Sequence, residues 1–227
     1  MNTTILWHDR DTLGAERCTL SSLQSGFRLA GMALCPADGV PLYVAYTVDV
    51  DADWRTRQVV VHVDLPHAVA DLALSADGAG AWWSHDEALS SVAGCLDVDL
   101  GITPATNTLP IRRLRLQPGA VATIGVAWVA FPSLRIVRSE QQYECLAVGH
   151  YRFRAGTYRA HLVVDAHGLV HDYEGAWRAI AQGRSDPPAL SPVSPAVPHP
   201  QHGSRTTSPS LLLLMMRSSS APGFSVG

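Results

Sequence analysis

The sequence predicts a mainly β fold built on an antiparallel sheet, and three observations predict it. Several stretches alternate between apolar and polar residues with a period of two, as half-buried strands do. Clusters of turn-forming residues separate these stretches at the spacing typical of an antiparallel sheet, sandwich or barrel. Signals for helices are few, so we expect only a minor helical part.

The clearest strand lies at residues 58–65, QVVVHVDL. Val59, Val61 and Val63 share one face and His62 lies on the other, because successive side chains of a strand point to opposite faces. Comparable stretches are residues 41–50, 120–131 and 157–164. The turn formers that separate such stretches are ADG, ADGAG, QPG and DAHG. We therefore expect short turns between neighbouring strands.

Helical signals are confined to two short segments. Residues 172–183, DYEGAWRAIAQG, are compatible with one short helix, and residues 85–93 with a further turn or two. Beyond them the composition changes, since residues 183–227 hold eight of the fifteen prolines and ten serines. Such a segment buries too little apolar surface to offset the entropy of the chain. We expect a β domain at residues 1–182 and a disordered tail at residues 183–227.

Composition and charge exclude several classes of protein. The chain has 227 residues, a net charge of −3 and a pI near 6.3, so nucleic acid is not an expected partner. We see no secretory signal and no apolar run long enough to span a membrane, and we expect a cytoplasmic protein. The four cysteines form no C-x-x-C pair and are expected to be buried thiols. No common cofactor or metal motif occurs, so we expect no cofactor and no metal.

Residues 94–116, GCLDVDLGITPATNTLPIRRLRL, gather polar side chains beside strand-like runs. If residues 111–116 form a strand, Arg112 shares its face with two leucines. A guanidinium in that position needs a carboxylate, because an unpaired buried charge is very costly. Asp97 and Asp99 lie on one face of the preceding run, and we expect them to pair with Arg112.

Two interpretations of this polar centre stay open. In the structural interpretation, a buried ion pair and an ordered loop hold two strands in register. In the functional interpretation, the same groups bind sugar hydroxyls or phosphates, and aromatic faces cover a sugar ring or an acyl chain. The candidate ligand-binding residues are Trp54, Asp97, Asp99, Thr103, Asn107, Arg112, Arg113 and Tyr143.

A catalytic interpretation is a further alternative. Asp97 and Asp99 could flank one glycosidic bond, as the paired carboxylates of glycoside hydrolases do. Neighbouring arginines would lower the pKa of each carboxyl group, however, and so weaken it as a general acid. A structural or interaction protein with no small ligand is the other alternative. We expect a non-catalytic protein.

The sequence also resembles a known family, labelled "putative glycolipid-binding" and formerly a domain of unknown function. The resemblance spans roughly residues 5–178 and is carried by LWHDRDTLGAERCTL, DADWRTR, GCLDVDLGITPATNTLPIRRL, QQYECL and VDAHGLVHDYEGAW. It implies one β-rich domain whose sheet curls into an incomplete barrel around a short helix, similar to bacterial lipoprotein-localisation carriers. It further implies non-catalytic binding of a glycolipid or another amphiphilic small molecule in or beside a cavity of the sheet, which is an inference from likeness of fold.

Overall fold

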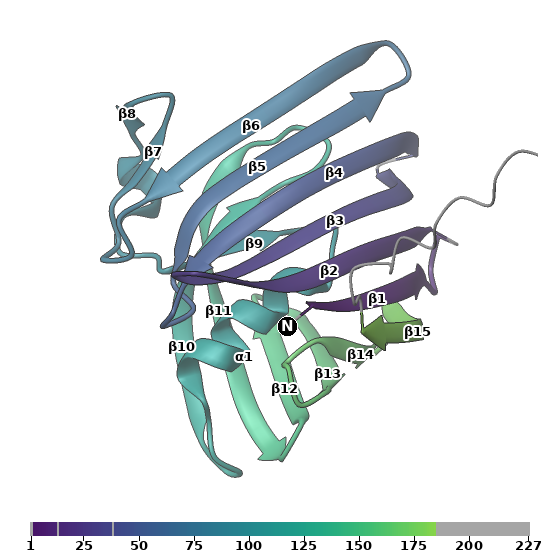
Figure 1. Ribbon diagram of the computed structural model, residues 1–227, viewed down its shortest axis with the longest axis vertical. Coiled ribbons are helices and arrows are strands. Elements are labelled where there is room, and N and C mark those ends of the chain that lie inside the picture. The colour runs from purple at the N-terminus through teal and green to yellow at the C-terminus, as the bar shows by residue number, and fades with distance from the viewer. Residues whose placement is uncertain (1, 13, 38, 185–227) are drawn as a thin grey trace, which may run out of the picture. The chain divides into compact units, whose positions relative to one another are not determined.

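The computed structural model describes residues 2–12, 14–37 and 39–184, which all belong to one compact unit, Met1–Ala189 (Figure 1). The predicted tail at residues 183–227 lies outside the described residues, apart from Gly183 and Arg184. These two residues end the last strand of the sheet.

The described residues form a single sheet of fifteen strands. The strands of its first half are β1 (Asn2–Asp9), β2 (Ala15–Leu23), β3 (Gly26–Ala37), β4 (Val40–Asp51), β5 (Thr56–Leu65), β6 (Ala68–Ala76), β7 (Trp82–Ser84) and β8 (Glu87–Ala88). Each strand pairs antiparallel with the next one along the chain. This half is therefore a meander with short turns, as the alternation in the sequence predicts.

The second half runs from the other edge of the sheet back to β1. Its strands are β9 (Asp97–Leu100), β10 (Val121–Val129), β11 (Ile136–Ala147), β12 (His150–Ala155), β13 (Tyr158–Val164), β14 (Val170–Tyr173) and β15 (Trp177–Arg184). The final strand, β15, pairs antiparallel with β1 and so joins the two halves. The pairing of β9 with β10 is parallel, a departure from the predicted antiparallel pattern.

Burial along the strands follows the predicted period of two. Val59, Val61 and Val63 are fully buried, whereas Val60 between them is 52% exposed. In β13, Ala160 is buried while its neighbours are exposed. One face of the sheet thus supplies the core, and the predicted β-rich fold class is confirmed.

The sheet curls but does not close into a barrel. Its edge strands are β8 and β9, and the segment around β9 meets β5 through isolated contacts. The backbone N–H of Thr56 donates to the carbonyl of Leu96 at 2.9 Å, and the N–H of Val98 donates to the Thr56 hydroxyl at 3.1 Å. In the described part of the chain, these bonds join the segment to β5, but β9 and β5 are not paired as neighbouring strands of the sheet. The barrel is incomplete, as the family resemblance implies.

A short helical segment fills the region between the halves of the sheet (Figure 1). It consists of a 3₁₀ turn, η2 (Ala105–Asn107), and a helix, α1 (Thr108–Leu114). The prediction of a strand over residues 111–116 is therefore wrong. Pro110 stands in the first turn of α1, where the N–H that it lacks has no partner within the helix. Among the described residues, no helix is long and apolar enough to cross a membrane.

The two helices predicted elsewhere are also corrected. Residues 172–183 form the end of β14, a turn and β15, with Gly175 in the turn at φ +75°. Pairing of this segment with β1 overrides its weak helical preference, because the extended backbone completes the hydrogen bonds of both strands. Residues 85–93 contain the two-residue strand β8 and the 3₁₀ turn η1 (Ser90–Val92). The four cysteines are buried free thiols, as predicted.

Candidate functional site

An ion pair between Asp97 and Arg113 ties α1 to the edge strand β9. Arg113 donates from Nε to Asp97 Oδ1 at 3.1 Å and from Nη2 to Oδ2 at 2.6 Å, which is the two-bond geometry that a guanidinium fork and a carboxylate favour. The Asp97 side chain is 1% exposed. The predicted partner, Arg112, is thus wrong by one residue, because a helix and a strand orient successive side chains differently.

Burial has the largest effect on the pKa of Asp97. It raises the pKa of this carboxyl group above the ordinary value, and the hydrogen bonds and charge of Arg113 lower it only in part. The neighbouring arginine does lower the pKa of this group, as expected, but the larger opposing effect of burial was not foreseen. The cost of removing a carboxylate from water exceeds the gain from one partner.

Asp99 lies in a second buried group of polar side chains. It accepts hydrogen bonds from Gln141 Nε2 at 2.5 Å and from the Thr106 hydroxyl at 3.1 Å. The hydroxyl of Tyr143 is 3.0 Å from Asn107 Oδ1 and 3.2 Å from Gln141 Oε1. These contacts join β9 and β11 to η2. Four predicted residues (Asp97, Asp99, Asn107 and Tyr143) consequently hold the helical segment against the second half of the sheet.

Thr103 connects the same segment to the first half of the sheet. Its hydroxyl donates to Glu16 Oε1 at 2.7 Å, and the hydroxyl of Tyr46 donates to the same oxygen. Glu16 is 1% exposed, and its second oxygen, Oε2, has no hydrogen-bond partner within the described residues. Burial raises the pKa of Glu16 to about 7. Sequence reasoning missed Glu16, although it shares the parity of the buried Cys18 in β2.

Arg112 turns away from both aspartates. Its Nη1 donates to the carbonyl of Ala166 at 3.1 Å, and its guanidinium carbon lies 5.0 Å from the centroid of the Trp54 ring. Trp54 in turn stacks on Phe27, with centroids 4.3 Å apart. Arg112 therefore lies over Trp54, in the turn between β4 and β5, and Trp54 stacks on Phe27 of β3. A narrow hollow of about 80 Å³ that includes His167 opens there.

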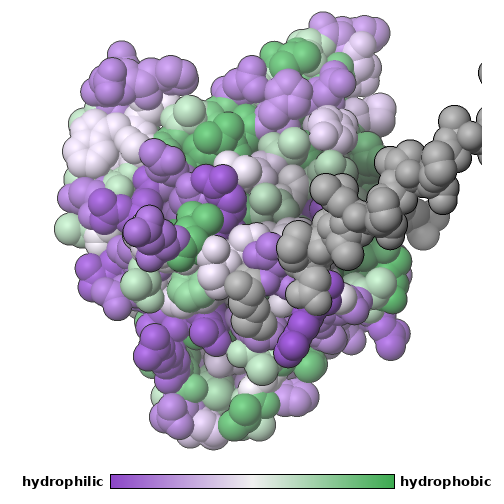
Figure 2. Space-filling model, in the orientation of Figure 1, coloured by the Kyte–Doolittle hydropathy of each residue, from purple (hydrophilic) through white to green (hydrophobic). Residues whose placement is uncertain are grey.

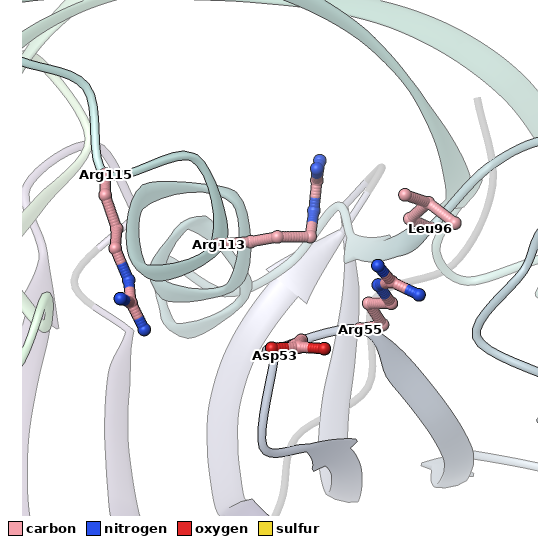
Figure 3. Close-up of a pocket in the computed structure, with 5 residues that line it drawn as sticks. All are labelled: Asp53, Arg55, Leu96, Arg113 and Arg115. Carbon is pink, nitrogen blue, oxygen red and sulfur yellow. The ribbon is translucent and has the colours of Figure 1, made fainter.

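A wider hollow lies beside Arg113 and has a volume of about 390 Å³ (Figure 3). We call it the arginine hollow, and its lining residues are Asp53, Arg55, Leu96, Arg113 and Arg115. Figure 3 shows the Arg113 side chain reaching from α1 to the side where Arg55 and Leu96 lie, with Arg115 on the other side of the helix. Three arginines are thus among the residues that line this hollow. Arg55 and Arg115 were not predicted as site residues.

A second hollow lies between the end of α1 and the β11–β12 hairpin, with a volume of about 420 Å³. We call it the hairpin groove, and its lining residues are Ile111, Arg112, Arg115, Val148, Gly149, Tyr151, Val164, Asp165, Ala166 and Gly168. Apolar side chains form much of its wall, and the charged residues that line it are Arg112, Arg115 and Asp165. Arg115 borders both the hairpin groove and the arginine hollow.

The structure therefore divides the predicted site residues into two groups. Trp54, Arg112 and Arg113 border the hollows described above. The other five, whose side chains are bonded beneath α1 and η2, border none of these three hollows. The helix at residues 108–114 was not predicted, and it directs Arg113 to Asp97 while it turns Arg112 away from both aspartates.

Comparison with known proteins agrees with the predicted family. A family model described as "Putative glycolipid-binding" matches residues 4–179. A crystal structure of a DUF1089 family protein from Pseudomonas aeruginosa is 35% identical, with a TM-score of 0.68 over 76% of this chain and 94% of that one. A beta-barrel-like protein of the domain of unknown function DUF1849 from Brucella abortus is 11% identical, with a TM-score of 0.48 over 82% and 97% of the two chains. A search of the curated proteins found no match. Since the family model covers most of the residues that form the sheet, this chain belongs to the family described as "Putative glycolipid-binding".

Proposed function

We propose that this protein binds an amphiphilic molecule of the glycolipid class, without catalysis, in the hairpin groove. The observation that carries the proposal is the make-up of that groove. Ile111, Val148, Tyr151 and Val164 offer apolar surface for an acyl chain. Arg112 and Arg115 offer guanidinium groups for a headgroup, whereas the Asp165 carboxylate already accepts hydrogen bonds from the N–H groups of His167 and Leu169 and from Gln182. A ligand site that combines apolar walls with a few polar anchors suits an amphiphile.

The tip of the β11–β12 hairpin supports the proposal. Val148 is 86% exposed and Leu146 is 39% exposed. Neither side chain has a hydrogen-bonding group, so a ligand that covers them breaks no hydrogen bond of these side chains with water. Figure 2 shows a few hydrophobic residues among hydrophilic ones at the lower end of the view. Covering such side chains with an acyl chain gains roughly 25 cal/mol for each Å² removed from water.

In this proposal, the buried aspartates position α1 and take no part in chemistry. Asp97 is bonded to Arg113, and Asp99 to Gln141 and Thr106. Each carboxylate thus already has partners inside the protein. The description of the family agrees with a binding function.

The test is co-sedimentation with phosphatidylcholine vesicles that contain galactosylceramide, compared with vesicles of phosphatidylcholine alone. We expect binding to the first, and we expect Val148→Asp to weaken it about tenfold because a charge then replaces an apolar contact. Val69→Asp is the matched control, since Val69 is 59% exposed on β6 and does not border the groove. Absence of binding to any glycolipid vesicle, or equal loss in both variants, would contradict the proposal.

A further inference from the structure

We propose that the arginine hollow binds one anionic group of the phosphate or sulfate class, so that the amphiphile has an anionic headgroup. The inference rests on the proposed function and adds the chemical class of the headgroup. It is argued from the charge at the hollow, from the backbone that places its arginines and from the position of Arg115.

Charge is the first support. Arg55, Arg113 and Arg115 bring three positive charges to the hollow, against the carboxylates of Asp53 and Asp97. Within the part of the chain that the structure describes, neither Arg55 nor Arg115 forms an ion pair. The group keeps an excess of positive charge, which an anion would neutralise. Planar guanidinium forks match the oxygens of a phosphate or sulfate in pairs.

The bonds of the three arginines leave donors for a ligand. Arg113 uses Nε and Nη2 for Asp97, which fixes its position, and its Nη1 makes no hydrogen bond within the described residues. Arg55 donates from Nη1 to the Gly78 carbonyl at 3.3 Å, and its other guanidinium donors make no hydrogen bond within the described residues. Arg113 is thus fixed by its ion pair with Asp97, whereas Arg55 and Arg115 have guanidinium donors that could bind the oxygens of an anion.

The backbone on both sides of the hollow is the second support. Arg115 ends α1 in the left-handed conformation, at φ 48° and ψ 44°, where glycine is the usual residue. Trp54, which stands directly before Arg55, has φ 66°. A residue with a side chain is less stable in this conformation than glycine, and such outliers gather at ligand sites. An arginine at position 115 therefore weakens the helix end while it brings a guanidinium to the hollow.

A purely structural role explains the arginines only in part. Basic residues near the C-terminus of a helix interact favourably with its last carbonyl groups, and this applies to Arg112 and Arg113 in α1. It does not apply to Arg55, which comes from the turn between β4 and β5. Arg115 also borders the hairpin groove. A headgroup at Arg115 would consequently lie beside the apolar wall proposed for the acyl chain.

The experiment compares two ligands that differ by one anionic group. Phosphatidylcholine vesicles containing galactosylceramide or its sulfated form are sedimented with the protein at constant ionic strength. We expect about tenfold tighter binding to the sulfated lipid, and we expect Arg55→Gln to remove that advantage while leaving binding to galactosylceramide unchanged, because Arg55 does not border the hairpin groove. Arg115 borders both hollows, so we expect Arg115→Gln to remove the advantage and also to weaken binding to galactosylceramide. Arg159→Gln is the matched control, because Arg159 is exposed on β13 and does not border the arginine hollow.

The outcomes separate this inference from the proposed function. Equal binding of both lipids, or a sulfate advantage that survives both arginine substitutions, would overturn the anion site and leave the glycolipid proposal standing. Titration with inorganic sulfate and inorganic phosphate forms the second arm. If these ions bind in a manner that needs Arg55 and Arg115 while no vesicle binds, the anion site stands and the glycolipid proposal fails. If neither the ions nor the sulfated lipid depends on these arginines, the anion site is wrong.

Discussion

Two arginines near the C-terminal end of α1, Arg113 and Arg115, use the same chemical group in opposite ways. Beneath the helix, Arg113 and Asp97 form a closed pair with 15% and 1% of their side chains exposed. At its C-terminal end, Arg115 is exposed and forms no ion pair among the described residues. The first arrangement holds the helix in place and the second presents a charge to a hollow. The difference teaches that the same residue type can have either role. An arginine that is buried with a charge partner stabilises the fold, and an arginine that is exposed without one can bind a ligand.

The largest expected effect tests the scaffold side of this comparison. We expect Arg113→Leu to lower the free energy of unfolding by about 3–5 kcal/mol, because it leaves the Asp97 carboxylate buried without its partner. Urea denaturation measures the loss. The matched control is Arg28→Leu, since Arg28 and Asp49 form a similar two-bond pair on the surface, where such a pair contributes at most about 1 kcal/mol.

A double variant, Arg113→Leu with Asp97→Leu, sharpens the same test. It removes both charges, and we expect it to recover much of the stability lost in the single variant. Equal losses for Arg113→Leu and Arg28→Leu would show that the pair beneath the helix is not buried in solution.

The next effect concerns Glu16 and depends on pH. Its pKa is about 7 in the folded protein, against 4.5 when it is exposed, so the folded state holds the proton more tightly. The contribution of this group to the free energy of unfolding is therefore fully present below pH 4.5 and is lost as the pH rises through 7. The loss amounts to about 3 kcal/mol.

Denaturation of the wild type and of Glu16→Gln at pH 5 and pH 8 measures this contribution. We expect the variant to lack the part of the pH dependence that Glu16 supplies, and to gain relative to the wild type at pH 8. Glu140→Gln, at an exposed position of β11, is the control. An identical pH dependence in wild type and Glu16→Gln would contradict the assignment.

A smaller loss is expected from the second buried group. Tyr143→Phe removes the hydroxyl that meets Asn107 and Gln141, and we expect it to lower the free energy of unfolding by about 1–3 kcal/mol, because buried polar atoms lose a partner. Tyr158→Phe, at a 46% exposed position, is the control. If thermal unfolding shifts equally in both variants, the buried contact does not stabilise the helical segment.

The smallest effect has the opposite sign and tests the exposed side. Arg115→Gly should raise the free energy of unfolding by roughly 1 kcal/mol, because glycine adopts the left-handed conformation at no steric cost. The same change should abolish preferential binding to the sulfated lipid. A variant that is more stable and still prefers that lipid would show that Arg115 plays no part in the site.

The β fold could be predicted from the sequence because the alternation of apolar and polar residues indicates which face of a strand is buried. Val59, Val61 and Val63 reveal this directly, and each is fully buried. The end of the chain was misread, because pairing with β1 is a contact between distant segments that residues 172–183 do not encode locally. Propensity is weak wherever such pairing completes a sheet.

The candidate site was predictable only in part. The segment containing Asp97 and Arg113 was identified correctly, but the strand assumed for residues 111–116 assigned the ion pair to Arg112. The helix there depends on Leu109 and Ile111 packing into the core, which a period of two cannot reveal. Arg55 and Arg115 were missed because an exposed arginine has no signature of its own, and only the fold brings these two to one hollow.

The junction of β1 with β15 has a consequence for biosynthesis. The first meander, β1–β6, consists of neighbours in sequence and can assemble as soon as it leaves the ribosome. The far side of β1 lacks its partner until residues 177–184 emerge, and an uncovered strand edge invites pairing with other chains. Nascent or truncated chains that end before β15 should therefore be the forms that depend most on chaperones.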